Sequence, residues 1–285
     1  MVKEFTLDSH TKIAVQETVG NKGTIIAIHG LTGNHKTFYH YRRLLESDYN
    51  FISLDLRGRG DSSPADESTS IFKHAEDIKA FIKLKKIEKP ILMGYSMGAY
   101  ICALVASELE VSGLILLDGA GKAEEKQKKL ILPSLSRLQK NYHSADDYVA
   151  QTKNIYEGLN VEWDEAVEEI TRYEVRETSD GWQHKSEAAA MEKDFTSFYA
   201  FEPGPTFEKI DCPTLLVIAN GSLGKNDPLF TKETYTETID KAKNLTTIEI
   251  PANHYTLVFE KQEAVEQSII ELLQDIKCDH TILRG

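Results

Sequence analysis

Long apolar runs are absent from this sequence of 285 residues. A helix that crosses a bilayer needs about 20 consecutive apolar residues, and no stretch of the sequence approaches that length. The opening residues, MVKEFTLD, also lack the apolar region of a secretory signal peptide. We therefore expect a cytoplasmic protein without a membrane-spanning segment.

Cysteine is scarce, with only three residues, Cys102, Cys212 and Cys278. Each lies in or near an apolar stretch. Three cysteines in a chain of this length do not make a disulfide framework. We expect buried thiols that stay reduced, as in the cytosol.

Basic residues are outnumbered, with 33 Lys and Arg against 45 Asp and Glu, which gives a formal net charge of −12. Such a surface repels phosphate backbones and anionic lipids, so we expect neither a nucleic-acid nor a membrane partner. The sequence also lacks the HExxH, paired CxxC, Walker A and GxGxxG patterns that bind metals and nucleotides. We accordingly expect no metal site and no cofactor.

The sequence does contain a regular alternation of short apolar runs and amphipathic stretches. The apolar runs are residues 24–28, 51–55, 90–95, 113–118, 213–219 and 245–250. Near-continuous apolar runs with Gly or Pro at their ends are typical of strands buried on both faces of a parallel sheet. Helical spacing marks residues 71–84, 97–109 and 264–276. The alternation predicts a doubly wound α/β domain, and residues 2–19 are expected to add an antiparallel hairpin at one edge.

One long segment, residues 122–205, interrupts this alternation. It is rich in Lys, Glu, Gln and aromatic residues, has helical periodicity and contains no run typical of a buried strand. It ends at the sequence EPGP, residues 202–205, which is a boundary signal. We interpret it as a helical cap inserted into one core that consists of residues 1–121 and 206–285.

The sequence GYSMG, residues 94–98, fits the G-x-S-x-G pattern, with an apolar run before it and a helical pattern after it. A serine in a turn that leads directly from strand to helix is strained, and side chains two residues away on either side would collide. Glycine at positions 94 and 98 avoids that collision. Ser96 then projects above the sheet, where the helix N-terminus favours negative charge. The pattern predicts Ser96 as a nucleophile.

A second motif, HGLTG at residues 29–33, follows the first buried run. Its glycines allow the backbone to turn, so that an N–H group faces the serine. An acyl-transfer site needs two such donors for the oxyanion. We assign them to the backbone N–H groups of Leu31 and Met97. We interpret His29, which precedes the nucleophile, as a structural residue that holds the loop.

The general base is expected after the last strand. His254, in the sequence PANHY, follows the run 245–250 and precedes the closing helix. The acid is expected between the serine and the histidine. Asp227 follows the fifth run and fits this order best, and its carboxylate would fix the tautomer of His254. Asp118, at the end of the fourth run, is the alternative acid.

At this point the sequence resembles the α/β-hydrolase superfamily. The matching segments are HGLTG at 29–33, DLRGRGDS at 55–62, GYSMGA at 94–99, NDP at 226–228 and NH at 253–254. The resemblance implies an eight-stranded, mostly parallel sheet with a cap between the sixth and seventh strands, which matches residues 122–205. It also implies Ser96 as nucleophile, Asp227 as acid and His254 as base, with a structural role for residues 55–62.

These residues predict a serine hydrolase that cleaves a carboxylic ester of a small or medium acyl substrate. Tyr95 and Tyr255, beside the nucleophile and the base, are expected to line the substrate site. A thioesterase, a lactonase or a C–C bond hydrolase would use the same residues. A non-hydrolytic small-molecule binding protein is the alternative of another class. The sequence leaves the oligomeric state open between monomer and homodimer.

Overall fold

The computed structural model describes residues 2–282, without the side chains of residue 133 and residues 277–282. Its centre is an eight-stranded sheet in the order β1-β2-β4-β3-β5-β6-β9-β10. The strands are β1 (Val2–Thr6), β2 (Lys12–Glu17), β3 (Thr24–Ile28), β4 (Asn50–Leu54), β5 (Ile91–Tyr95), β6 (Gly113–Leu117), β9 (Thr214–Ala219) and β10 (Leu245–Ile250).

The sheet is parallel from β4 to β10, and only the pairs β1–β2 and β2–β4 are antiparallel. The predicted doubly wound α/β fold with eight mostly parallel strands is therefore confirmed, as is the antiparallel hairpin at the edge. Every residue of β5, β6 and β9 is buried. That burial explains why these strands read as unbroken apolar runs in the sequence.

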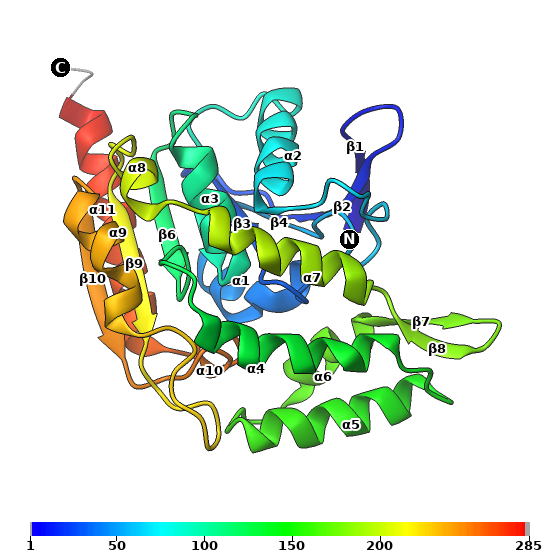
Figure 1. Cartoon of the computed structure of the whole chain (residues 1–285). Coiled ribbons are helices and arrows are strands. Elements are labelled where there is room, and N and C mark those ends of the chain that lie inside the picture. Colours follow the sequence, from blue (N-terminus) through cyan, green and yellow to red (C-terminus); the bar gives the residue numbers. More distant parts are fainter. Residues whose placement is uncertain (1, 283–285) are drawn as a thin grey trace.

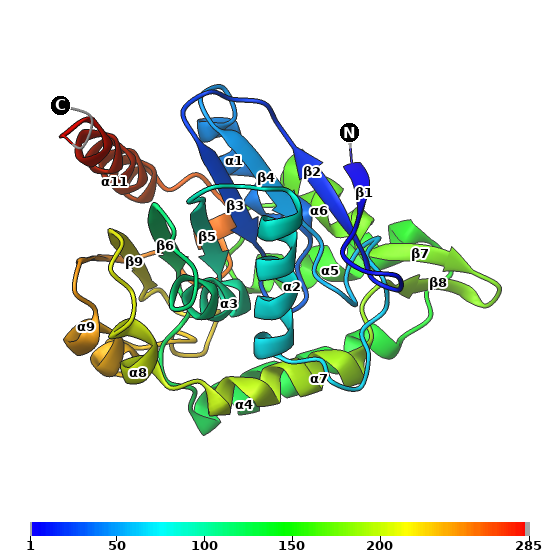
Figure 2. The same cartoon turned by 90° about the horizontal axis from the view of Figure 1, so that it is seen from above.

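Helices cover both faces of the sheet (Figure 2). The helices α1 (Tyr39–Leu45) and α11 (Glu263–Ile282) lie on one face, and α2 (Ile71–Leu84) and α3 (Met97–Ala106) lie on the other. Two apolar clusters, one on each side of the sheet, fill the space beneath them. The helices and the apolar clusters exclude water from both faces of the sheet. A functional site is therefore expected at the ends of the strands.

The local sequence of α2 explains where this helix begins, which face it buries and where it ends. The Ser70 side chain caps its N-terminus by accepting a hydrogen bond from the Lys73 backbone N–H at 3.1 Å. Ile71, Ile78 and Phe81 share one buried face. The helix ends at Leu84, and Lys86, the residue after its C-cap, has a φ of 55° in the left-handed region.

The segment between β6 and β9 lies beside the carboxyl ends of the parallel strands. Figure 1 shows α4, α5, α6 and the hairpin β7–β8 below the sheet, on the side where the arrows of β9 and β10 end. The elements of this segment are α4 (Glu125–Leu135), η2 (Ser136–Gln139), α5 (Ala145–Gly158), α6 (Glu165–Tyr173), β7 (Val175–Thr178), β8 (Gly181–His184), α7 (Ala188–Ser197), η3 (Phe198–Ala200) and α8 (Pro203–Phe207). We call α4 to η3 the cap.

The cap is helical as predicted, but it also contains the hairpin β7–β8, which the sequence analysis missed. Each strand has four residues, of which only one is buried, so no buried apolar run marks it. The limits 122–205 stay a prediction, and α8 runs across the second of them. The remaining elements are η1 (His35–Phe38), η4 (Lys232–Tyr235), α9 (Thr236–Lys241) and α10 (Thr256–Phe259).

The structure describes the side chains of two of the three cysteines that were expected to be buried. Cys102 is buried, Cys212 is partly buried, and the side chain of Cys278 lies outside the described residues. Over residues 2–282, none of the helices combines the length and the apolar character that a bilayer crossing requires.

The helix α3 packs against the sheet without room for side chains at two glycines. A Cβ atom on Gly98 would lie 1.8 Å from the carbonyl oxygen of Ile28, and one on Gly94 would lie 2.3 Å from the carbonyl oxygen of Gly98. Both obstacles are backbone atoms, which cannot rotate away. The collision predicted around the serine is therefore present in the structure.

We expect Gly98→Ala to lower the free energy of unfolding by about 3 kcal/mol or more, because the added methyl group forces α3 away from β3. Urea denaturation measures the change. Gly158→Ala is the matched control, since nothing lies within 4 Å of a Cβ there and alanine favours a helix by about 0.5–1 kcal/mol. Equal stability of the two variants would contradict this account of the packing.

Candidate active site

Ser96 occupies the junction between β5 and α3 in a strained backbone conformation. Its φ is 53° and its ψ is −118°, a combination that costs a non-glycine residue roughly 1–3 kcal/mol. The Ser96 N–H donates to the Leu117 carbonyl oxygen at 3.0 Å, which fixes the turn against β6. The turn holds the Ser96 hydroxyl at the carboxyl edge of the sheet, beneath the cap.

His254 lies between Ser96 and a buried carboxylate. Its Nε2 is 3.0 Å from Ser96 Oγ, and its Nδ1 is 2.7 Å from Asp118 Oδ2. Asp118 is fully buried, and Ser96 and His254 are also buried. A carboxylate accepts hydrogen bonds, so Nδ1 carries the proton and Nε2 is free to accept from the serine hydroxyl. The predicted nucleophile and base are thus brought together.

Asp118 is held by two donors besides His254, one from β9 and one from η4. Its Oδ1 accepts from the Ala219 backbone N–H and from the Tyr235 hydroxyl, each at 3.2 Å. Burial and the neighbouring carboxylate raise the pKa of Tyr235 well above its usual value, so it stays a neutral donor. Asp118 follows β6, the strand between β5 and β9, with a φ of 48°. This position sets its carboxylate behind the histidine ring.

The structure corrects the assignment of the acid to Asp227. The Asp227 side chain is 85% exposed and lies 3.9 Å from Lys126 Nζ, not beside His254. Leu223 and Asn226 close a tight turn through two reciprocal 2.9 Å backbone hydrogen bonds, and Asp227 comes just after it. Both aspartates follow a strand and both lie between serine and histidine in the chain, so chain order alone did not separate them.

The loop that carries His254 is anchored from both sides. The Tyr95 hydroxyl donates to the His254 carbonyl oxygen at 2.9 Å. Asn253 accepts from the backbone N–H groups of Tyr255 and Thr256, and its amide donates to the Leu159 carbonyl oxygen at the end of α5 at 2.7 Å. The base is therefore held by both the core and the cap.

The loop 29–33 approaches the serine as predicted, and His29 has the structural role expected of it. A Cβ on Gly30 would lie 3.2 Å from Ser96 Cβ. The His29 Nδ1–H donates to the Gly30 carbonyl oxygen at 2.7 Å, and its Nε2 accepts from the Leu56 N–H at 3.1 Å. Burial lowers the pKa of His29 to about 3, which agrees with a neutral ring.

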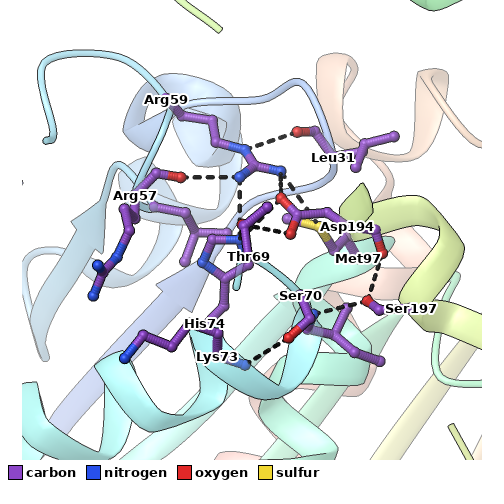
Figure 3. A network of polar contacts seen from close by, with 12 residues as sticks. Leu31, Arg57, Arg59, Thr69, Ser70, Lys73, His74, Met97, Asp194 and Ser197 are labelled. Carbon is purple, nitrogen blue, oxygen red and sulfur yellow. Dashed lines mark hydrogen bonds and ion pairs between the residues drawn. The ribbon is translucent and has the colours of Figure 1, made fainter. Parts of the chain in front are cut away.

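A buried ion pair joins this loop to the cap (Figure 3). Arg59 Nη2 lies 2.6 Å from Asp194 Oδ2 on α7, and neither side chain is exposed. Arg59 Nε donates to the Leu31 carbonyl oxygen at 3.0 Å. His74 and Thr69 complete the contacts of Asp194, at 3.0 Å and 2.7 Å. Asp194 could not be singled out in the sequence, because a single acid in a charged segment carries no distinguishing pattern.

A second buried carboxylate, Asp55, begins the segment 55–62 for which the resemblance implied a structural role. It accepts from the His35 backbone N–H at 2.7 Å, from the Asp61 N–H at 3.0 Å and from the Tyr173 hydroxyl of α6 at 2.6 Å. A Cβ on Gly60 would lie 2.0 Å from Asp55 Oδ2. Glycine therefore allows the segment to fold around this carboxylate.

A cavity of about 440 Å³ lies between the core and the cap, within the range usual for small-molecule sites. Ser96 and His254 line it, and so do Leu31, Tyr95 and Tyr255. The two tyrosines therefore lie where the sequence analysis expected them. Among the described residues, no group of three or more His, Cys, Asp or Glu side chains is arranged to hold a metal ion.

The chain is similar in sequence to known proteins. The family model described as "alpha/beta hydrolase fold" matches residues 23–261. The chain is 36% identical over 124 residues to the AB hydrolase superfamily protein YisY of Bacillus subtilis, which is 42% of this chain and 46% of that protein. It is 32% identical over 78 residues to the esterase YbfF of Escherichia coli, 27% of this chain and 30% of that protein. The matches thus span less than half the length of these curated relatives.

Solved structures share the fold over nearly the whole chain. The crystal structure of E-2-(acetamidomethylene)succinate hydrolase superposes with a TM-score of 0.84, and the alignment covers 96% of this chain and 99% of that one. The sequence identity is 18%. The likeness is one of fold.

We expect Asp194→Asn to lower the free energy of unfolding by about 3–5 kcal/mol, because Arg59 would keep a buried charge without a counterion. Asp146→Asn is the control. It removes the exposed pair with Arg172, which contributes about 1 kcal/mol or less. Urea denaturation with equal m-values measures both changes, and a loss for Asp194→Asn no larger than for the control would contradict the importance of the buried pair.

Acid is expected to destabilise the fold through His29. The unfolded chain binds a proton on this residue near pH 6.5, whereas the folded state keeps it neutral down to about pH 3. The unfolded state binds more protons between these values, so the free energy of unfolding falls as the pH falls, by at most about 1.4 kcal/mol per pH unit from this residue. Denaturation curves from pH 6 to pH 4 should have a shallower pH dependence in His29→Gln. An equal slope in both proteins would argue against a neutral buried His29.

Proposed function

The chain belongs to the α/β-hydrolase fold family, and we propose that within it this protein is a serine hydrolase that cleaves a carboxylic ester of a small or medium acyl substrate. The observation that carries the proposal is the continuous contact from Ser96 Oγ to His254 Nε2 at 3.0 Å and from His254 Nδ1 to Asp118 Oδ2 at 2.7 Å. This contact lies at the wall of the cavity between core and cap.

The first half-reaction transfers the acyl group to Ser96. His254 Nε2 takes the hydroxyl proton while Oγ attacks the carbonyl carbon of the ester, and the buried Asp118 carboxylate stabilises the imidazolium that forms. Asp118 also fixes the tautomer with the proton on Nδ1. His254 then donates its Nε2 proton to the departing alkoxide.

The tetrahedral intermediate needs donors for its oxyanion. We assign this role to the backbone N–H groups of Leu31 and Met97, the residues that follow Gly30 and Ser96. Gly30 approaches Ser96 closely, and Met97 opens α3, where the helix N-terminus favours negative charge. One such donor contributes roughly 3–4 kcal/mol in a measured case.

The second half-reaction returns the enzyme to its starting state. Water loses a proton to His254 Nε2 and attacks the acyl carbon, and Ser96 leaves as its hydroxyl with the proton that His254 returns. The sequence of steps uses no cofactor. An esterase among the partial relatives, YbfF, supports ester chemistry over the thioester, lactone and C–C alternatives.

Labelling with a fluorophosphonate probe tests the nucleophile. We expect the wild-type protein to be labelled covalently and Ser96→Ala to remain unlabelled, because an activated serine displaces fluoride from the probe and becomes phosphonylated. Ser107→Ala, which alters a hydroxyl at the far end of α3, is the control and should label normally. A folded wild-type protein that resists the probe would favour a non-hydrolytic binding protein instead.

Asn substitutions separate the two aspartates. Asp118→Asn should lower kcat on a p-nitrophenyl ester by about 10⁴-fold, as loss of the buried triad aspartate does in a serine protease. Asp227→Asn should change kcat less than about twofold, because the Asp227 carboxylate is exposed and its contact with Lys126 contributes little free energy. The opposite ranking would restore Asp227 as the acid.

A further inference from the structure

Two cationic side chains line the cavity that contains Ser96, and the described part of the chain adds no acidic one. Arg137 and Lys140, from η2 and the residue that follows it, belong to its wall. Most of the remaining wall is apolar, and the cap contributes Leu130, Ile131, Leu135, Ile155 and Leu159. This local charge is opposite in sign to the net charge of the whole chain.

Arg137 is held in place by a buried hydrogen-bond chain in the cap. Its Nη1 donates to the Tyr148 hydroxyl at 3.1 Å, and Tyr148 donates in turn to the Glu174 carboxylate. Tyr148 and Glu174 are both buried. This chain fixes one side of the guanidinium against the cap, and the side chain also faces the cavity.

Among the described side chains, no ion pair within 4 Å joins a carboxylate to the Arg137 guanidinium or to Lys140 Nζ. Burial alone would lower the pKa of Arg137, but Tyr148 and Glu174 raise it above its usual value, so the guanidinium stays charged. A half-buried guanidinium beside an apolar cavity favours an anion there.

We propose that Arg137, assisted by Lys140, binds a carboxylate of the substrate, so that the enzyme acts on acidic esters in preference to neutral ones. This inference rests on the proposed ester hydrolysis, because it places the anion in the same cavity as Ser96. Lys140 is exposed and lies at the solvent edge of the cavity, where it attracts the anion.

A carboxylate fits this pair better than a larger anion. One N–H group of Nη1 donates to Tyr148, which leaves other N–H donors of the guanidinium for a planar, bidentate partner. The rest of the cavity wall is mainly apolar and suits the carbon chain between the carboxylate and the ester. Removing a charged hydrogen-bond partner of this kind weakens binding by about tenfold or more.

The competing explanation is that Arg137 only balances the buried charge of Glu174. Under that explanation, Arg137→Gln lowers stability and total activity but leaves the preference between acidic and neutral substrates unchanged. The ratio of kcat/KM values within one variant therefore distinguishes the two roles.

The kinetic experiment uses two pairs of esters that differ in one charge. In the first pair the acyl part carries the charge: the mono-p-nitrophenyl ester of adipic acid against its methyl ester. In the second pair the leaving group carries it: 4-(hexanoyloxy)benzoate against methyl 4-(hexanoyloxy)benzoate. We expect wild type to prefer the acid by about tenfold or more in at least one pair, and Arg137→Gln to lose that preference. Lys129→Gln, which removes an exposed charge from α4 outside the cavity wall, should retain it.

A binding experiment tests the anion site without turnover. Calorimetric titration of wild type and Ser96→Ala with the dicarboxylates from glutarate to suberate should detect binding that weakens with salt and falls about tenfold or more in Arg137→Gln. Hexanamide, which is neutral, should bind less tightly than adipate.

The two experiments separate the failure of the inference from the failure of the proposed function. The carboxylate site is overturned if the esters are hydrolysed without a preference for the acid in either pair, or if no dicarboxylate binds. Neither result contradicts the proposed ester hydrolysis. Dicarboxylate binding that depends on Arg137, with no fluorophosphonate labelling and no hydrolysis, overturns the hydrolase and keeps the anion site. An acid preference that persists in Arg137→Gln overturns the role of Arg137.

Discussion

The close approach of α3 to the strands beneath it is the constraint on which the rest of the structure depends. Backbone atoms of β3, α3 and the turn after β6 lie so near one another that Gly94, Gly98 and Gly119 have no room for a Cβ atom. This contact forces Ser96 into its left-handed backbone conformation and brings the end of β6 beside the end of β5. The nucleophile and the Asp118 carboxylate are therefore positioned by the same packing.

The cap is joined to the core by buried polar contacts as well as by apolar ones. Asp194 of α7 meets Arg59, and Tyr173 of α6 donates to Asp55. Arg59 also holds the Leu31 carbonyl oxygen, so a single guanidinium connects the cap to the loop proposed for the oxyanion. Movement of the cap would leave these charges without partners in a dry environment, which costs several kcal/mol. The contacts favour one fixed arrangement of cap and site.

The net charge of the whole chain and the charge of the cavity wall are opposite in sign. The acidic excess of the whole chain disfavours polyanionic partners. Inside the cavity the sign is reversed, because Arg137 and Lys140 line it and none of the other described residues of its wall is acidic. A small carboxylate beneath the cap is close to these two cations and shielded from the acidic surface. Net charge therefore describes the surface of this protein better than it describes its site.

The elements whose causes are local could be predicted from the sequence alone. The apolar runs at 24–28 and 245–250 and the amphipathic stretch 71–84 became β3, β10 and α2 with the same limits. The expectation that 245–250 is buried on both faces was wrong, because β10 is the last strand of the sheet and only its Ile250 is buried. Ser96 and His254 were also recognised in the sequence, because a strand-to-helix turn and a position after the last strand each leave a pattern there. The choice between Asp118 and Asp227 was decided only by the tertiary structure, since both satisfy chain order and only the sheet order puts β6 beside β5. The pairing of Asp194 with Arg59 and the position of Arg137 in the cavity wall were likewise beyond the sequence, because each brings together side chains whose separation in space depends on how the cap folds back over the sheet.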